Sequence, residues 1–151
     1  MTSTRKDLHK FQKTGLFVFH GTPVKVKDLN PRQAYNYVKG VRTRDGKPAV
    51  FATPFVDLAI FRAVVNRKNC PSNYCSGFSY RNKKLGFRAS KFTLDQLNNS
   101  SKGYVYIFKK HDFMKSNPCE SVAFKKVMPF KLVKVTSKDL PSKIFIIKGG
   151  K

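Results

Sequence analysis

Acidic residues are scarce in this sequence of 151 residues. Eight Asp and Glu stand against 31 Lys and Arg, which gives a formal net charge of +23, and Glu120 is the only glutamate. Such an excess of positive charge favours a polyanionic partner, and nucleic acid is our first expectation. An anionic membrane surface and a merely soluble basic protein are the alternatives. Paired carboxylates are absent, which argues against a glycosidase of the two-acid kind.

Cysteines and long apolar runs are also few. Cys70 and Cys75 are separated by four residues, wider than the usual zinc turn, and Cys119 brings no matching second pair. We therefore expect no metal, and reduced thiols in an intracellular protein of the cytoplasm, nucleoid or nucleus. No run approaches the roughly 20 apolar residues that span a bilayer. Residues 1–15 are polar and basic, so we expect neither a secretory signal nor a membrane partner.

The composition suits one domain with an ordinary core, since 40% of the residues are apolar and 14 are Phe, although Trp is absent. We expect a basic N-terminal arm over residues 1–14 and a single α+β domain over residues 15–151, present as a monomer. The expected elements are a strand at 15–20, a short helix at 32–40, a strand at 49–54, a helix at 55–68, a helical turn at 92–99, and strands at 103–110, 120–127, 130–136 and within 139–148.

Two further segments are irregular by sequence. Asp45-Gly46 is typical of a tight turn. Residues 66–92 mix basic, small and aromatic residues without a clean period, which indicates a long excursion with a strand near 85–92. Neither a Walker loop nor a G-x-G-x-x-G motif occurs anywhere in the sequence.

Three short segments carry the candidate chemistry. "FHGT" at 19–22 ends the first expected strand, "VFATPFVDLAIFRA" at 50–63 leads from a strand into a helix, and Glu120 opens a later strand. Each has an ordinary explanation when taken alone. His20 would be a packing histidine, the aromatic residues of the second segment would belong to the core, and Glu120 would be a surface residue.

In this order, the three segments resemble the His–Tyr–Glu branch of the ADP-ribosyltransferase superfamily, which includes diphtheria-toxin-like and poly(ADP-ribose)-polymerase-like domains. The resemblance implies a split, mixed or antiparallel β-sheet core with few helices, and an enzyme that uses NAD as a substrate. Phe61 stands where the family usually has a tyrosine. Pro118 stands where arginine-modifying relatives carry Gln or Glu, which disfavours modification of protein arginine.

The resemblance also implies roles for individual residues. His20 would hydrogen-bond a hydroxyl of the nicotinamide-side ribose. Glu120 would hold a ribose hydroxyl and stabilise positive charge as the bond to nicotinamide breaks. The other contacts would be a glycine backbone at the carboxamide, an aromatic wall around the nicotinamide ring, and arginines bordering the cleft, which would bind the pyrophosphate or a nucleic-acid backbone. These cofactor-binding residues are Gly21, Thr22, Phe51, Phe61, Arg42 and Arg44.

Basic and aromatic residues interleave between positions 62 and 91. Basic side chains would neutralise phosphates and aromatic rings would stack on exposed bases of DNA or RNA. The expected nucleic-acid-binding residues are Arg62, Arg67, Lys68, Tyr74, Tyr80, Arg81, Lys83, Lys84, Arg88 and Lys91. The alternative is a solvated basic loop with packing aromatics.

Three functions are consistent with these patterns. The first is an NAD-dependent ADP-ribosyltransferase-like enzyme acting on nucleic acid or while bound to it. The second is a non-enzymatic basic nucleic-acid-binding protein on the same fold. The third is a base-modifying or base-excising enzyme that uses the same cleft.

Overall fold

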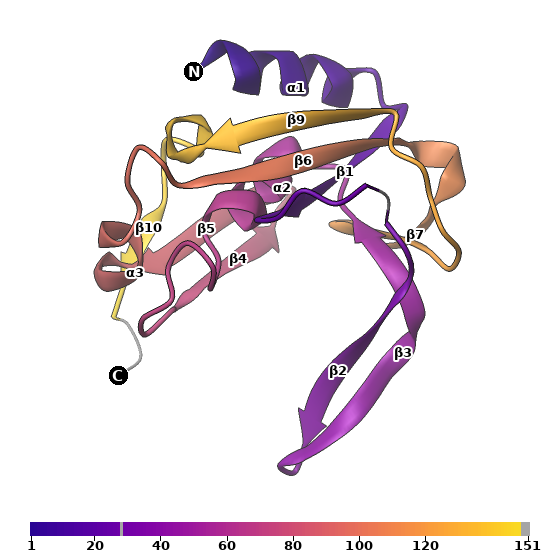
Figure 1. The fold of residues 1–151 in the computed structure, drawn as a ribbon, viewed down its shortest axis with the longest axis horizontal. Coiled ribbons are helices and arrows are strands. Elements are labelled where there is room, and N and C mark those ends of the chain that lie inside the picture. The colour runs from indigo at the N-terminus through magenta and orange to yellow at the C-terminus, as the bar shows by residue number, and fades with distance from the viewer. Residues whose placement is uncertain (28, 149–151) are drawn as a thin grey trace.

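A computed structural model describes residues 1–27 and 29–148; the last residues of the expected domain, 149–151, lie outside the described part. The fold is α+β with more strand than helix, as predicted (Figure 1). The helices are α1 (Ser3–Lys13), α2 (Val56–Val64) and α3 (Lys91–Asp95), with 3-10 turns η1 (Lys110–Asp112) and η2 (Ser137–Asp139). The strands are β1 (Phe17–Thr22), β2 (Arg32–Val38), β3 (Val41–Ala52), β4 (Ser76–Arg81), β5 (Lys84–Ser90), β6 (Lys102–Lys109), β7 (Met114–Asn117), β8 (Glu120–Ala123), β9 (Lys131–Thr136) and β10 (Phe145–Ile147).

The strands form three sheets, ordered β1-β6-β9, β2-β3-β8-β7 and β10-β5-β4. Phe19 and Thr53 exchange two backbone hydrogen bonds of 2.7 Å, which join β1 to the end of β3. Through this bridge the first two sheets meet, and the strand order across the junction is β7-β8-β3-β1-β6-β9. The junction is therefore the place where the three sequence segments approach one another.

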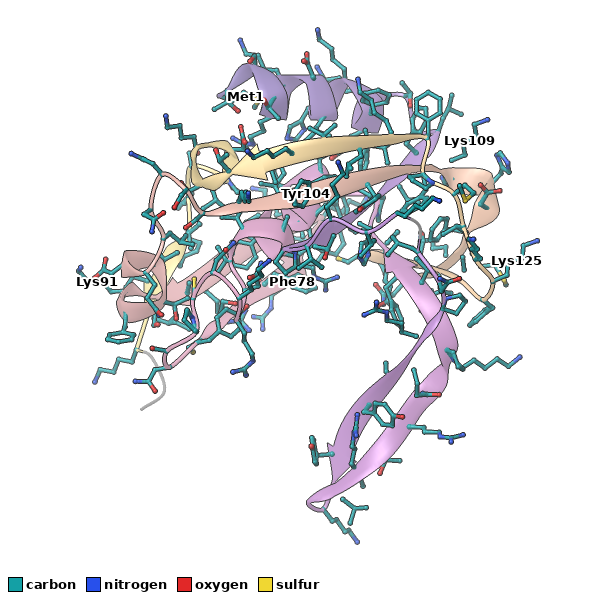
Figure 2. The ribbon with its side chains drawn as sticks, viewed as in Figure 1. Met1, Phe78, Lys91, Tyr104, Lys109 and Lys125 are labelled. Carbon is teal, nitrogen blue, oxygen red and sulfur yellow. The ribbon has the colours of Figure 1, made fainter. Side chains whose placement is uncertain are left out.

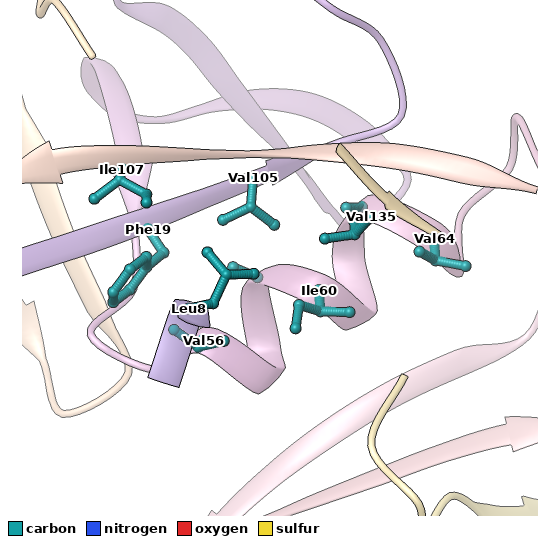
Figure 3. Close-up of a cluster of buried hydrophobic side chains, with 10 residues drawn as sticks. Leu8, Phe19, Val56, Ile60, Val64, Val105, Ile107 and Val135 are labelled. Carbon is teal, nitrogen blue, oxygen red and sulfur yellow. The ribbon is translucent and has the colours of Figure 1, made fainter. Parts of the chain in front are cut away.

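Helix α2 is buried on most of its surface because it lies between two sheets; of its residues, Asp57 is half-buried and Arg62 is exposed. Val56, Ile60 and Val64 pack with α1 and the β1-β6-β9 sheet (Figure 3). Leu58 and Phe61 belong to a separate cluster against the β4–β5 hairpin. A helix with apolar residues on most of its circumference is expected at the centre of a core, and the predicted helix is confirmed there.

Two glycines allow α2 to lie directly on the sheet. A Cβ atom added to Gly21 on β1 would lie 1.8 Å from the carbonyl oxygen of Ala59, and one added to Gly103 on β6 would lie 2.0 Å from that of Ala63. Ala59 and Ala63 are one helical turn apart, so both face the same sheet. Small residues on both sides therefore set the distance between helix and sheet.

The basic N-terminal arm forms a helix, α1, that packs on the core. Leu8 is 1% exposed and packs in the cluster around α2 (Figure 3). Gln12 Oε1 accepts a hydrogen bond of 2.7 Å from the backbone N–H of Val56, at the start of α2. Phe55, the N-cap residue of α2, offers no side-chain hydrogen bond, so α1 supplies the missing cap.

Asp57 fixes α1 against α2 through an ion pair. Arg5 donates two hydrogen bonds, of 2.9 and 2.8 Å, to the Asp57 carboxylate, and His9 Nε2 lies 2.9 Å from Asp57 Oδ1. Burial would raise the pKa of Asp57, but its hydrogen bonds to Arg5 and His9 outweigh burial, so the pKa lies below its usual value.

The helix predicted at 32–40 is wrong, because these residues form β2 and the turn of a long hairpin. Lys39 and Gly40 both have positive φ, 51° and 79°, which suits a two-residue hairpin turn. The turn predicted at Asp45-Gly46 instead lies inside β3, where the register shifts between Arg32 and Ala34 of β2. Antiparallel pairing with β3 makes residues 32–38 a strand. Tyr and Val alone do not determine whether a short segment is helix or strand, because strand preference depends on packing against neighbours.

The long excursion predicted over 66–92 is largely a second hairpin, β4–β5, whose turn uses positive φ at Asn82 and Lys83. The strand predicted near 85–92 corresponds to β5. The helical turn and the later strands are confirmed as α3, β6, β8, β9 and β10, although β8 ends at Ala123, earlier than expected.

Candidate functional site

His20 lies near the end of β1, where the neighbouring strand holds its ring. Nδ1 lies 2.6 Å from the carbonyl oxygen of Phe51 on β3. A carbonyl oxygen only accepts hydrogen bonds, so Nδ1 carries the proton in this contact. In the neutral ring Nε2 is then an acceptor, which suits a hydroxyl donor such as that of a sugar.

The surroundings of His20 favour the neutral ring. Burial, the largest influence, lowers the pKa of His20, and the charges of Arg62 and Arg32 lower it further. The hydrogen bond to Phe51 acts in the opposite direction without reversing the shift. His20 is therefore neutral at pH 7, with a defined tautomer.

A pocket of about 160 Å³ opens beside His20. Its wall includes His20, Thr22, Leu29, Arg32, Val50 and Phe51. Ligand pockets commonly measure about 300–1,000 Å³, so this one has room for a single ring or sugar, and the rest of a dinucleotide would lie outside it. Arg32, which sequence reasoning did not select, is the cation at its rim.

A larger hollow, of about 660 Å³, lies where β1 begins and β6 ends, around Phe17, Lys109 and Phe113. Its wall contains no residue of the three sequence segments. The first two segments contribute His20, Thr22, Val50 and Phe51 to the smaller pocket, whereas Glu120 is not among the residues that line it.

Glu120 is the first residue of β8. Strand β3 lies between β8 and β1, the strand of His20. The register pairs Phe51 with Val122 and Ala52 with Ser121, which brings Glu120 to the end of β3 that bridges to β1. The side chain is half-buried, and Oε2 lies 3.5 Å from Nδ2 of Asn117.

Arg62 on α2 links His20 and Glu120 electrostatically. Burial lowers the pKa of Arg62, and the charge of Glu120 acts against that shift. The same guanidinium lowers the pKa of His20, and its Cζ lies 5.2 Å from the centroid of the Phe78 ring. The charge of one cation therefore interacts with both candidate catalytic residues.

Several predicted cofactor residues have other surroundings. Phe61 is 3% exposed and its ring centroid lies 4.9 Å from that of Phe87, so the ring as placed belongs to the core. Gly21 lies against α2, which is by itself sufficient reason for a glycine. Thr22 lines the pocket, and its hydroxyl bonds Val24 at 3.3 Å.

Arg42 and Arg44 are not brought to the pocket. They lie on the outer part of β3, seven or more residues before Phe51. At about 3.3 Å per residue, this separation is roughly 23 Å or more along the strand. Their predicted place beside the cleft is therefore corrected, and they belong to the projecting hairpin.

In the predicted nucleic-acid surface the basic side chains are exposed, whereas the rings of Tyr74 and Tyr80 are half-buried. Its exposed cations are Arg62, Arg67, Lys68, Arg81, Lys83, Lys84, Arg88 and Lys91. Tyr80 is half-buried against Phe55, with ring centroids 5.4 Å apart. Tyr74 is half-buried beneath Arg67 and donates a hydrogen bond to the carbonyl oxygen of Val65. Lys91 lies at one side of the molecule, and Lys109 and Lys125 lie at the opposite side (Figure 2), so positive charge is spread beyond this surface.

Among the described residues, no group of three or more His, Cys, Asp or Glu side chains could hold a metal ion. Cys70, Cys75 and Cys119 are free thiols, and burial raises the pKa of Cys70 and of Cys119. No helix in the described part of the chain is both long and apolar enough to cross a membrane.

The pKa of His20 predicts a pH dependence of stability. Its folded-state value lies below the value of about 6.5 in an unfolded chain, so the unfolded chain takes up a proton first as the pH falls. The stability that depends on a neutral His20 is fully present above about pH 6.5, and it decreases as the pH falls from there toward the folded-state pKa. Urea unfolding at pH 7.5 and 5.5 should show a smaller loss for His20→Gln than for the wild type.

The expected difference is below about 1.4 kcal/mol for each pH unit. His111→Gln is the control, because His111 is exposed, and this variant should lose stability as the wild type does. Equal losses for the wild type and His20→Gln would contradict the assignment of His20 as a half-buried, neutral ring.

Comparison with known proteins gives no match to this chain among protein-family models, curated proteins or solved structures.

Proposed function

We propose that this protein is an NAD-dependent ADP-ribosyltransferase-like enzyme that acts on nucleic acid or while bound to it. The observation that carries the proposal is the arrangement of His20 and Glu120 on strands either side of β3, with Arg62 near both. The split sheet that the resemblance implies is compatible with the junction of β1 and β3. One fixed acceptor nitrogen and one carboxylate are the groups that the resemblance assigns to the ribose.

In the proposed reaction the bond between ribose C1″ and the nicotinamide nitrogen breaks, and its electron pair leaves with nicotinamide. Positive charge develops at C1″, and a nucleophile of the acceptor then bonds to C1″ and loses its proton. The neutral His20 would accept a hydrogen bond from a ribose hydroxyl through Nε2. The Glu120 carboxylate would stabilise the developing charge, because a negative group fixed in place does not need to reorganise during the reaction.

The pocket fits one end of the substrate. A volume of about 160 Å³ accepts a ribose or a nicotinamide ring, and the negatively charged pyrophosphate would lie near Arg32 at the rim. The charge of Arg62 interacts with that of Glu120, so Arg62 would help to position the carboxylate.

Glu120→Gln tests the proposal, because it keeps the shape of the side chain and removes its charge. We expect nicotinamide release from NAD to fall by about 10²- to 10³-fold, the usual effect of removing one preorganised electrostatic group. Asp95→Asn is the control; Asp95 is exposed and pairs with Lys91 on α3. The proposal fails if nicotinamide release by Glu120→Gln equals that of the wild type while Asp95→Asn behaves normally.

A second candidate is a non-enzymatic nucleic-acid-binding protein, which the small pocket and the spread of exposed cations favour. It predicts salt-dependent binding of nucleic acid without nicotinamide release by the wild type. For phosphate-dominated binding, the logarithm of the affinity falls linearly with the logarithm of the salt concentration. Base release in the absence of NAD would instead indicate base-excising chemistry.

A further inference from the structure

The β2–β3 hairpin projects away from the body of the molecule (Figure 1). It pairs Tyr35 with Arg44 and Tyr37 with Arg42. Cross-strand partners point to the same side of a hairpin, and alternate residues of a strand share a face. These four side chains therefore lie on one face, which we call the Tyr–Arg face. The opposite face carries Ala34, Val38, Val41 and Thr43.

Both tyrosine rings of the Tyr–Arg face are open to solvent. Tyr35 is 46% exposed and Tyr37 is 71% exposed. The Arg42 guanidinium carbon lies 3.7 Å from the centroid of the Tyr35 ring, which shows that the ring already accepts a flat, charged group against its face. These rings differ from those of Tyr74 and Tyr80, which are half-buried against the body.

Charge complementarity identifies the kind of partner. The hairpin carries Arg32, Lys39, Arg42, Arg44 and Lys47. A partner must therefore offer negative charge, and the exposed rings favour one that also offers flat rings. An acidic peptide supplies only the charge. A base-paired duplex keeps its bases stacked on one another, whereas an unpaired strand presents both phosphates and free ring faces.

We propose that the Tyr–Arg face binds single-stranded nucleic acid, with Tyr35 and Tyr37 stacking on unpaired bases and Arg42 and Arg44 neutralising phosphates. The inference rests on the nucleic-acid part of the proposed function and deepens it by naming the form of the partner and the surface that holds it. It places recognition on the hairpin, away from the pocket beside His20.

The test uses the full chain and labelled 12-nucleotide strands of thymidine and of uridine, without NAD. Loss of base–aromatic stacking should weaken binding by roughly 5- to 150-fold for each ring in contact, measured with Tyr35→Ala/Tyr37→Ala. In Arg42→Gln/Arg44→Gln, the slope of log affinity against log salt should become shallower by about 1.4, because two phosphate contacts are lost. Thr43→Ala, on the opposite face, should bind within twofold of the wild type.

Two results would overturn the proposal. One is binding of the unpaired strands by Tyr35→Ala/Tyr37→Ala at wild-type affinity. The other concerns polyglutamate, a control probe that has charge but no rings, so its affinity should not depend on the tyrosines. If Tyr35→Ala/Tyr37→Ala weakened binding of polyglutamate as much as binding of the unpaired strands, stacking on bases would be excluded. Because the assay contains no NAD, its outcome is independent of nicotinamide release, so failure of the transferase proposal and failure of this one are separate observations.

Discussion

Gly21→Ala and Gly103→Ala are each expected to destabilise the protein by about 3 kcal/mol, at the upper end of the usual cost of overpacking. The added methyl carbon would lie 1.8 Å from a carbonyl oxygen of α2 in one case and 2.0 Å in the other. Both obstructing atoms belong to backbone, which cannot rotate away as a side chain can. The helix must therefore move off the sheet, which disturbs the clusters on both of its sides.

Thermal unfolding measures this effect. For a chain of this length, a loss of about 3 kcal/mol corresponds to a fall in Tm of roughly 6–12 °C. Gly86→Ala is the matched control, because its new methyl carbon meets only the side-chain oxygen of Ser79, at 3.0 Å. A Tm for Gly103→Ala equal to that of Gly86→Ala would contradict the close packing of α2. Gly103 is the cleaner site, since no ligand role is proposed for it.

Leu8→Ala is expected to cost about 2–5 kcal/mol, the range for deleting a buried leucine side chain. Leu8 is 1% exposed and lies between α2 and the β1-β6-β9 sheet (Figure 3). The measurement is the free energy of unfolding in urea. The control is Leu16→Ala, at a residue that is 65% exposed, where a change within about 0.5 kcal/mol is expected. Similar values for the two variants would mean that α1 does not contribute to the core.

Residues whose pattern is strong by itself were predicted correctly. The apolar residues around Val56–Val64 recur at helical spacing and therefore predict α2. The alternation in Lys102–Lys109 likewise predicts β6. The sequence of α1 does not indicate that this helix packs on the core, because Leu8 is its one fully buried residue among many polar ones.

The hairpin could not be identified from its own residues. Residues 32–38 accept either helix or strand, and the deciding partner is β3, which follows after the turn at Lys39 and Gly40. The one available signal was the repeated spacing of Tyr35 with Tyr37 and of Arg42 with Arg44, which has a period of two. That period is typical of a strand with distinct faces.

The roles of the candidate site residues stay a prediction, and the geometry of the site could not be predicted from the sequence. His20 and Glu120 were selected by their positions in the sequence, but the contact of His20 with Phe51 depends on the bridge between Phe19 and Thr53. Such a bridge is a long-range backbone interaction with no local sequence signal. The burial of Phe61 has the same origin, because it depends on where the β4–β5 hairpin packs.

The projecting hairpin also restricts how this protein could vary between species. Adding one residue to a single strand would reverse the orientation of every side chain beyond it and separate the tyrosines from the arginines. Adding two residues to each strand would lengthen the hairpin and keep all four side chains on one face. Insertions and deletions in the regularly paired part, between Tyr35 and Arg44, should therefore occur in matched pairs, and the reach of the hairpin can change in evolution without any change in the core.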